Sequence, residues 1–213
     1  MKIINYIKTI NDKNKKLKVL DVGCSRGFIA KELQNYGFDF YGIEFNKEDA
    51  KEAKKYYKEI KLIDLDKEKP NYKNNSFDLI IMADIIEHLK DSVEIVKYFT
   101  KFLKKEGIMI ISTANVANIY VRLKLLLGNF DYEERGIMDK THLRFFTLKT
   151  FRKLARGAGL KIIKEDFAPI PLPMVHMAFA EDNILNILHK LNYAATKAIP
   201  KIVSFQLILY CRK

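Results

Sequence analysis

The sequence predicts an α/β protein built on a doubly wound, parallel, Rossmann-like sheet. Short apolar, β-branched runs alternate with segments of helical spacing along most of the 213 residues. The first such run, Lys18–Val22, leads into a glycine-containing loop and then a helix. A later run, Phe77–Met82, is apolar along nearly its whole length, as expected for a central parallel strand buried on both faces.

The same patterns place the individual elements. Strands are expected at Lys18–Val22, Asp39–Glu44, Ile60–Ile63, Phe77–Met82, Ile108–Ser112, Leu160–Lys164 and Phe205–Tyr210. Helices are expected at residues 2–16, Phe28–Tyr36, Lys47–Tyr57, Asp91–Leu103, Thr150–Ala158 and Asn183–Ala198. Because parallel crossovers are right-handed, these helices should cover both faces of the sheet.

Length and composition indicate one globular domain. Hydrophobic residues make up 48% of the chain and charged residues 30%, which are ordinary values. We expect an N-terminal helix within residues 1–17, a single domain over residues 18–213, and two inserts at about 114–146 and 168–200 that form the acceptor side.

Several features favour a cytoplasmic protein. The only two cysteines, Cys24 and Cys211, lie near opposite ends of the chain and form no metal-spaced pair. The N-terminus lacks the apolar core of a signal peptide, and no run approaches the ~18 apolar residues of a transmembrane helix. The net charge of +12 fits a polyanion partner, but the lysines are spread over the whole chain, so compositional bias explains it at least as well.

The loop after the first strand has the pattern Asp21-x-Gly23-x-Ser25-x-Gly27. A dinucleotide site uses loop amides to hold a pyrophosphate, which a carboxylate at the strand end would repel. S-adenosylmethionine (SAM) has no phosphate and carries an ammonium and a sulfonium that Asp21 can face. The glycines allow the backbone to approach the ligand closely. The pattern therefore favours SAM.

Two further acids follow the next strands. Glu44 can accept the ribose hydroxyls, and Asp64 is placed to receive the adenine amino group. Each acid alone could be a solvated strand end, but three after successive strands favour a site. The predicted cofactor-binding residues are Asp21, Gly23, Cys24, Ser25, Gly27, Glu44, Phe45, Asp64, Leu65 and Asp84.

The segment after the fourth strand carries candidate chemistry. On a helical turn, Asp84, Glu87 and His88 would share one face, and His142 is a fourth candidate. These four residues are candidate ligands of Mg²⁺ or Mn²⁺, which would lower the pKa of an acceptor hydroxyl. In a metal-free alternative, His142 or His88 is the general base. In a structural alternative, His88 caps the turn and Glu87 is merely solvated.

The glycine loop and its flanking residues resemble those of a known family. Val19–Ala30 resembles motif I of the class I SAM-dependent methyltransferases, with Ser25 in place of a usual glycine. The resemblance continues through Phe77–Ile80 and spans essentially the whole chain. It implies a seven-stranded sheet whose last strand is antiparallel, with helical inserts after strand five and between strands six and seven.

Two finer resemblances concern the acceptor. Asp84–Leu89 resembles the Glu-x-x-Glu-His-Leu block with which small-RNA 2′-O-methyltransferases hold Mg²⁺ or Mn²⁺, although Asp84 reaches one carbon less far. Glu-His at this point also resembles ubiquinone-type O-methyltransferases. The stretch from Ser112 to Thr147 is similar to methyltransferases of surface-glycan synthesis, which implies a sugar hydroxyl as acceptor.

The residues of the two inserts indicate the acceptor less specifically. Basic and aromatic residues of the first insert suit sugar faces, nucleotides or nucleic acid, while Phe145 and Phe146 are better explained as core anchors. The second insert is expected to cover the acceptor pocket. Simple packing on the sheet is the plainer explanation of its helix, and peripheral membrane contact with a lipid-linked glycan is another.

Together these observations predict a SAM-dependent O-methyltransferase acting on a sugar, glycan or other small hydroxyl acceptor. His142, His88 and Glu87 are the predicted catalytic residues. An RNA 2′-O-methyltransferase is the first alternative and would bind polynucleotides in a salt-sensitive way. A non-catalytic SAM-binding protein is the second.

Overall fold

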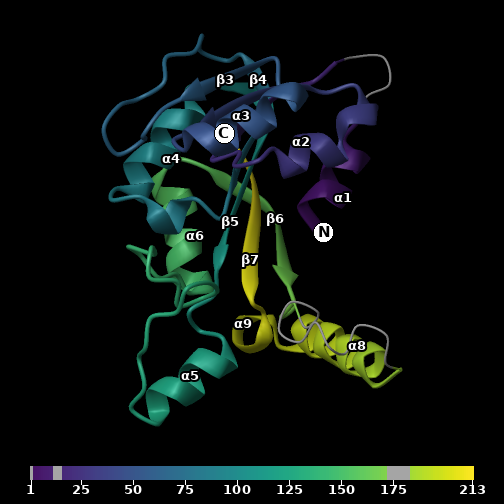
Figure 1. Cartoon of the computed structure of the whole chain (residues 1–213), viewed down its shortest axis with the longest axis vertical. Coiled ribbons are helices and arrows are strands. Elements are labelled where there is room, and N and C mark those ends of the chain that lie inside the picture. The colour runs from purple at the N-terminus through teal and green to yellow at the C-terminus, as the bar shows by residue number, and fades with distance from the viewer. Residues whose placement is uncertain (1, 12–15, 172–182) are drawn as a thin grey trace.

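The chain forms one seven-stranded sheet in a computed structural model that describes residues 2–11, 16–171 and 183–213 (Figure 1). The strands are β1 (Lys18–Val22), β2 (Asp39–Glu44), β3 (Glu59–Leu62), β4 (Phe77–Ala83), β5 (Leu103–Ala114), β6 (Lys161–Ala168) and β7 (Gln206–Arg212). Their order in the sheet is β3-β2-β1-β4-β5-β7-β6.

Strand directions confirm the predicted fold class. The pairs β1/β2, β1/β4, β2/β3 and β4/β5 are parallel. The last strand, β7, runs antiparallel to both of its neighbours, β5 and β6. The C-terminal ends of β1, β2 and β4 therefore meet at one edge, where ligands bind in open α/β sheets.

Helices cover both faces of the sheet. The α-helices are α1 (Lys2–Thr9), α2 (Phe28–Glu32), α3 (Lys47–Ala53), α4 (Ser92–Thr100), α5 (Ile119–Leu126), α6 (Leu148–Gly157), α8 (Asn183–Ala198) and α9 (Pro200–Val203), and the 3₁₀ turns are η1 (Gln34–Tyr36), η2 (Lys54–Tyr56) and η3 (Ile86–His88).

Alternate residues of β4 pack into two different apolar clusters. Ile80 and Met82 belong to a cluster with residues of α4 and α6, while Leu79 and Ile81 belong to one with residues of α1, α2 and α3. This period of two is the consequence of the strand pleat.

Several sequence-based boundaries were wrong. The N-terminal helix, expected over 2–16, ends at Thr9. The fifth strand begins at Leu103, five residues before the expected Ile108, because Leu103 is buried and pairs with Phe77 at the start of β4. The expected helix Asp91–Leu103 correspondingly ends at Thr100.

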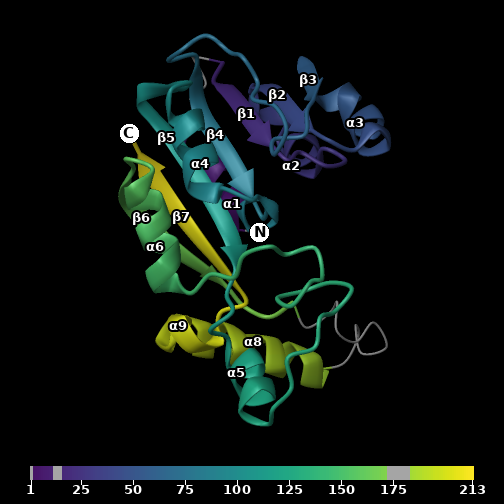
Figure 2. The same cartoon turned by 90° about the vertical axis from the view of Figure 1, so that its left-hand side faces the viewer.

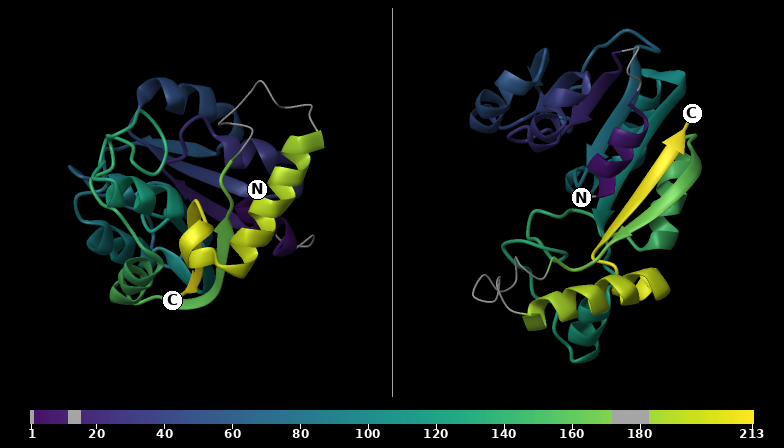
Figure 3. Two further views of the ribbon diagram at one scale, coloured as in Figure 1. Left: turned by 90° about the horizontal axis from the view of Figure 1, so that it is seen from below. Right: turned by 90° about the vertical axis from the view of Figure 1, so that its right-hand side faces the viewer.

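The described parts of the two inserts contain helices, as predicted, and lie beyond the end of β5. Residues 172–182 of the second insert lie outside the described residues. Figures 2 and 3 show α5, α8 and α9 gathered at one end of the molecule. Buried amides join the first insert to the end of α9: Asn115 Nδ2 donates to the Ser204 carbonyl at 3.0 Å, and Asn118 Nδ2 donates to the Val203 carbonyl at 2.9 Å. Within the described residues, no helix has both the length and the apolar character needed to cross a membrane.

Candidate active site

The loop between β1 and α2 is held in a conformation that requires left-handed residues. Gly23, Ser25 and Gly27 have φ angles of 75°, 45° and 78°. The amides of Gly23 and Cys24 donate to the Ile43 carbonyl at 2.8 and 3.0 Å, which ties the loop to the end of β2. Ser25 thus adopts a conformation that glycine tolerates more readily than any other residue.

Gly27 permits a close approach between the loop and the end of α3. A Cβ at this position would lie 3.0 Å from Tyr57 Cε2 and 3.1 Å from Ala53 Cβ. We expect Gly27→Ala to lower the free energy of unfolding by about 2–4 kcal/mol, from backbone strain and overpacking together.

Gly37→Ala is the matched control for this prediction in denaturant unfolding. Gly37 has a φ of 66° but no heavy atom within 4 Å of its Cβ position, so its substitution adds the backbone strain alone, about 1 kcal/mol. Equal losses of stability in the two variants would show that the close packing at Gly27 is unimportant.

Glu44 closes the loop from the β2 side. Its carboxylate is 5% exposed and accepts backbone amides from Ser25 at 2.8 Å, Phe45 at 2.9 Å and Asn46 at 2.9 Å. Oε2 receives only one of these bonds, so it keeps capacity for a ribose hydroxyl. The neighbouring Phe45 ring is 70% exposed and offers an open aromatic face beside this carboxylate.

Asp21 is buried at the end of β1 and is held by Tyr57. The Tyr57 hydroxyl donates to Asp21 Oδ2 at 2.7 Å. Burial raises the pKa of Asp21 to about 6, the bond from Tyr57 opposes this, and Glu44 adds to the increase. A cationic ligand group at this position would favour the charged carboxylate. Tyr57 was expected only as the last residue of a helix, because no local pattern links it to Asp21, 36 residues earlier.

Removing the Tyr57 hydroxyl should weaken cofactor binding. In Tyr57→Phe, Asp21 loses a charge-assisted hydrogen bond worth about 1.5–3 kcal/mol, so we expect SAM affinity to fall about tenfold at pH 7. Calorimetric titration measures this. Tyr56→Phe, in the same turn, removes a hydroxyl for which no bond to Asp21 is seen and should leave the affinity unchanged.

Two further predicted cofactor-binding residues, Asp64 and Leu65, lie after β3. The Asp64 carboxylate accepts from the Asp66 amide at 3.1 Å and pairs with Lys67 at 2.9 Å, and the bond from Lys67 lowers its pKa. Leu65 is buried in the core. Contact of either residue with adenine stays a prediction.

Asp84 adopts a strained backbone conformation where β4 ends. Its φ is 51°, which is uncommon for a non-glycine residue and typical of functional sites. Its carboxylate accepts from Ser112 Oγ at 2.9 Å and from Gln206 Nε2 at 2.5 Å. Ser112 and Gln206 could not be identified as partners of Asp84 from local sequence patterns, because they come from strands far along the chain.

Asp84, Glu87 and His88 do not share one helical face, so that expectation was wrong. The left-handed Asp84 is followed by the short 3₁₀ turn η3, and the three side chains differ in burial. Asp84 is exposed, Glu87 is buried and His88 lies between these extremes.

Glu87 is an interior residue rather than a solvated one. It is 2% exposed, and its Oε1 accepts from the Ala114 amide at 3.3 Å, while Oε2 has no hydrogen-bond partner among the residues that the structure describes. Burial, and secondarily Asp84, raises the pKa of Glu87 to about 8, so the side chain is mostly protonated at neutral pH. Its backbone carbonyl accepts from Leu143 and Arg144, which fixes the segment that follows His142.

His88 and His142 lie together, with ring centroids 4.8 Å apart. His142 Nδ1 is 3.0 Å from the Ile137 carbonyl, and His88 Nδ1 is 3.2 Å from the Thr141 carbonyl. A carbonyl can only accept, so each Nδ1 donates and each neutral ring keeps Nε2 as its basic nitrogen. Burial, with a smaller effect of His88, lowers the pKa of His142.

The four predicted metal ligands do not form a ready coordination shell. Among residues 2–11, 16–171 and 183–213, no three His, Cys, Asp or Glu side chains are grouped as a metal site. Both Asp84 oxygens accept protein hydrogen bonds and Glu87 is mostly protonated. Binding of Mg²⁺ or Mn²⁺ by these four residues stays a prediction.

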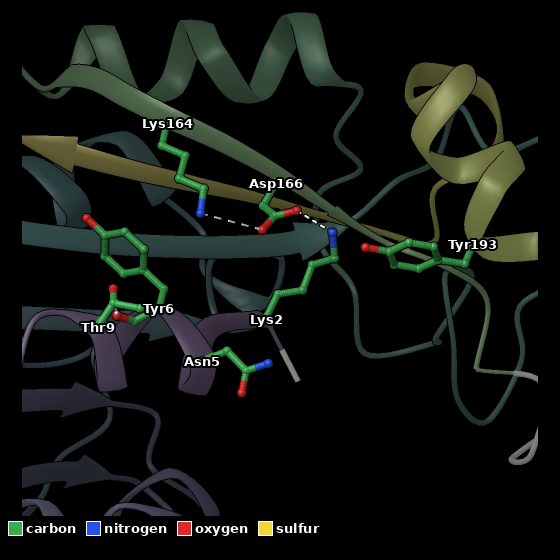
Figure 4. Close-up of a pocket in the computed structure, with 7 residues that line it drawn as sticks. All are labelled: Lys2, Asn5, Tyr6, Thr9, Lys164, Asp166 and Tyr193. Atoms are coloured by element: carbon green, nitrogen blue, oxygen red, sulfur yellow. Dashed lines mark hydrogen bonds and ion pairs between the residues drawn. The ribbon is translucent and has the colours of Figure 1, made fainter. Parts of the chain in front are cut away.

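A cavity of about 380 Å³ lies elsewhere, between α1, β6 and α8 (Figure 4). Its lining residues are Lys2, Asn5, Tyr6, Thr9, Lys164, Asp166 and Tyr193, and none of them is a predicted site residue. Asp166 pairs with both Lys2 and Lys164. The cavity is therefore separate from the candidate site.

Comparison with known proteins agrees with this geometry. A family described as "methyltransferase domain" matches residues 2–165. A ubiquinone biosynthesis O-methyltransferase of Pelagibacter ubique is 32% identical over 133 residues, which cover 56% of this chain and 55% of that protein. One from Bartonella bacilliformis is 28% identical over 155 residues, or 70% and 62% of the two chains. The chain thus matches about half to three fifths of the length of these curated relatives.

Solved structures show the same fold. A SAM-dependent methyltransferase from Archaeoglobus fulgidus superposes with a TM-score of 0.69 at 16% identity, covering 100% of this chain and 91% of that one. The [4+2]-cyclase SpnF superposes with a TM-score of 0.66 at 16% identity, covering 100% and 80% of the two chains. Since these identities are low, the structures support the fold and leave the reaction to be argued from the site.

Proposed function

The chain belongs to the class I SAM-dependent methyltransferase family, and from this premise we propose that it methylates a hydroxyl oxygen of a small acceptor. The observation that carries the proposal is His142, whose Nδ1 is bonded to a carbonyl and whose neutral Nε2 is left to accept a proton. Relatives named as O-methyltransferases support an oxygen acceptor.

Each group has a definite role in this reaction. Bound SAM supplies an electrophilic methyl group on a sulfonium. Asp21 and Glu44 bind the cofactor through its cationic end and its ribose. His142 Nε2 takes the hydroxyl proton as the oxygen forms its bond to the methyl carbon and the carbon–sulfur bond breaks. The products are a methyl ether, S-adenosylhomocysteine and a proton held on His142. Methyl transfer is direct, so positioning supplies most of the rate.

The acceptor is a sugar or another small hydroxyl compound. The resemblance of the Ser112–Thr147 stretch to methyltransferases of glycan synthesis supports a sugar, and the names of the curated relatives support a phenolic hydroxyl. Radiolabelled SAM should be incubated with nucleotide sugars, oligosaccharides, catechol-type phenols and RNA. Label in a sugar or phenol as a stable ether supports the proposal. Label confined to RNA supports the 2′-O-methyltransferase alternative, and cofactor binding without any transfer supports a non-catalytic protein.

Methyl transfer should not depend on a divalent metal. We expect addition of EDTA to change the rate on the labelled acceptor less than twofold, because a histidine base needs no metal to take the proton. A matched reaction with EDTA pre-saturated by Mg²⁺ controls for the chelator itself. Loss of activity in EDTA that Mg²⁺ or Mn²⁺ restores would instead assign Asp84, Glu87, His88 and His142 to a metal site.

A further inference from the structure

Helix α5 stands out from the body of the protein. It projects at the end of the molecule that also carries α8 and α9 (Figures 1 and 2). All eight of its residues are described, and Val121 alone among them is buried, at 4% exposure. Val121 packs with Ile137 and Met138 in a small apolar cluster, which anchors the helix on one side.

The opposite side of α5 is apolar and faces solvent. Ile119, Leu123, Leu126 and Leu127 are 39%, 52%, 81% and 76% exposed. Successive helical residues are turned by about 100°, so this spacing places all four on the side away from Val121. Soluble surfaces rarely expose a contiguous apolar patch without a binding role. We call these four residues the α5 apolar face.

Basic residues predominate in the segments that carry α5, α8 and α9, and one acid from the neighbouring loop, Glu133, reaches α5. Residues 115–130 and 183–205 contain Arg122, Lys124, Lys190, Lys197 and Lys201 but no aspartate or glutamate. Lys124 is paired with Glu133 at 3.0 Å, whereas Arg122, Lys190, Lys197 and Lys201 are exposed. Leu191 on α8, Ile199 between the two helices and Ile202 on α9 are further exposed apolar side chains.

We propose that the α5 apolar face docks this protein on an anionic lipid surface. An apolar helix face flanked by lysine and arginine is the arrangement that lies in the headgroup region of a bilayer, with cations attracted to acidic lipids. At eight residues, or about 12 Å, α5 can lie in that region but is far too short to cross it. The inference does not depend on the methyl acceptor.

Charge favours a lipid surface over a second copy of the chain. In a symmetric dimer through α5, the same patch would meet itself, so Arg122 and its basic neighbours would face like charges. An anionic bilayer supplies the opposite charge to these basic side chains. Docking would also bring the membrane close to the candidate base, because Ile137, which packs on Val121, holds His142 through its carbonyl.

The test is co-sedimentation with vesicles of phosphatidylcholine containing phosphatidylglycerol, against vesicles of phosphatidylcholine alone. We expect binding to the anionic vesicles that weakens with salt and falls more than about tenfold in Leu126→Ser/Leu127→Ser. Val93→Ser/Ile163→Ser is the matched control, because those side chains are 37% and 40% exposed on α4 and β6. It should bind as the unaltered protein does, and retained SAM binding shows that each variant is folded.

A fluorescence measurement gives an independent readout. The chain contains no tryptophan, so Leu126→Trp introduces a single reporter into the α5 apolar face. Its emission should shift to the blue on adding anionic vesicles, while that of Ile163→Trp should not. Absent binding, binding that does not distinguish the two vesicle types, or binding unaffected by the leucine substitutions would overturn the proposal. A leucine-dependent dimer in sedimentation equilibrium, without vesicle binding, would assign the face to a second copy instead.

Discussion

Asp21→Asn should weaken SAM binding at least about 30-fold and, at the same time, stabilise the cofactor-free protein. The loss of binding follows because a buried carboxylate facing the cationic end of the cofactor contributes about 2–5 kcal/mol. The gain in stability follows from the pKa of Asp21, which is about 6 in the folded protein against an ordinary 3.8.

The raised pKa of Asp21 determines how the stability of the folded protein changes with pH. A raised carboxyl pKa means that the folded protein binds the proton more tightly than the unfolded chain, so stability is lost as pH rises from about 4 through 6. Above pH 7 the buried charge costs up to about 3 kcal/mol, which asparagine avoids. We expect a gain of about 1–3 kcal/mol, or several degrees in Tm, at pH 7.5. For the same reason, SAM affinity of the unaltered protein should fall as pH drops through 6.

Asp78→Asn is the matched control. Asp78 lies at the opposite end of the sheet and accepts from Lys104 Nζ at 2.8 Å and the Lys18 amide at 3.0 Å. Its loss should destabilise the protein while leaving SAM affinity unchanged. The account of Asp21 fails if Asp21→Asn binds SAM normally, or if it is less stable than the unaltered protein above pH 7.

His142→Gln should reduce methyl transfer by about 10²- to 10⁴-fold, the usual contribution of a general base, while SAM affinity stays within about twofold. Glutamine can keep a bond to the Ile137 carbonyl but cannot take up a proton. Steady-state kinetics on the acceptor found by radiolabelling should show the loss in kcat rather than in KM for SAM.

A substitution of His88 distinguishes the roles of the two imidazoles. His88→Gln should cost about tenfold or less, because His88 holds the His142 segment through Thr141 but is not the proposed base. Imidazole added to His142→Gly should restore part of the rate, which a purely structural role would not allow. The opposite ranking of the two variants would make His88 the base.

Local patterns were enough to predict much of the fold. The second strand, Asp39–Glu44, and the helix Asn183–Ala198 have the boundaries expected from the sequence. The strand–loop–helix at Asp21–Gly27 also lies where it was expected, because its glycines, its acid and the flanking apolar runs are close together in the chain.

Interactions between distant segments were not predictable from these patterns. Tyr57 reaches Asp21 and Gln206 reaches Asp84 across 36 and 122 residues. The left-handed Asp84 separated the three residues that helical spacing had placed on one face. The early start of β5 also depends on pairing with β4 rather than on local propensity.

Calorimetric titration of the purified chain with SAM at pH 7.5, alongside Asp21→Asn and Asp78→Asn, tests the central claim most directly. We expect one site that binds SAM and S-adenosylhomocysteine, is greatly weakened by Asp21→Asn, and is unaffected by Asp78→Asn. No binding at millimolar SAM, or equal affinity in all three proteins, would contradict a SAM site built on the loop that follows β1.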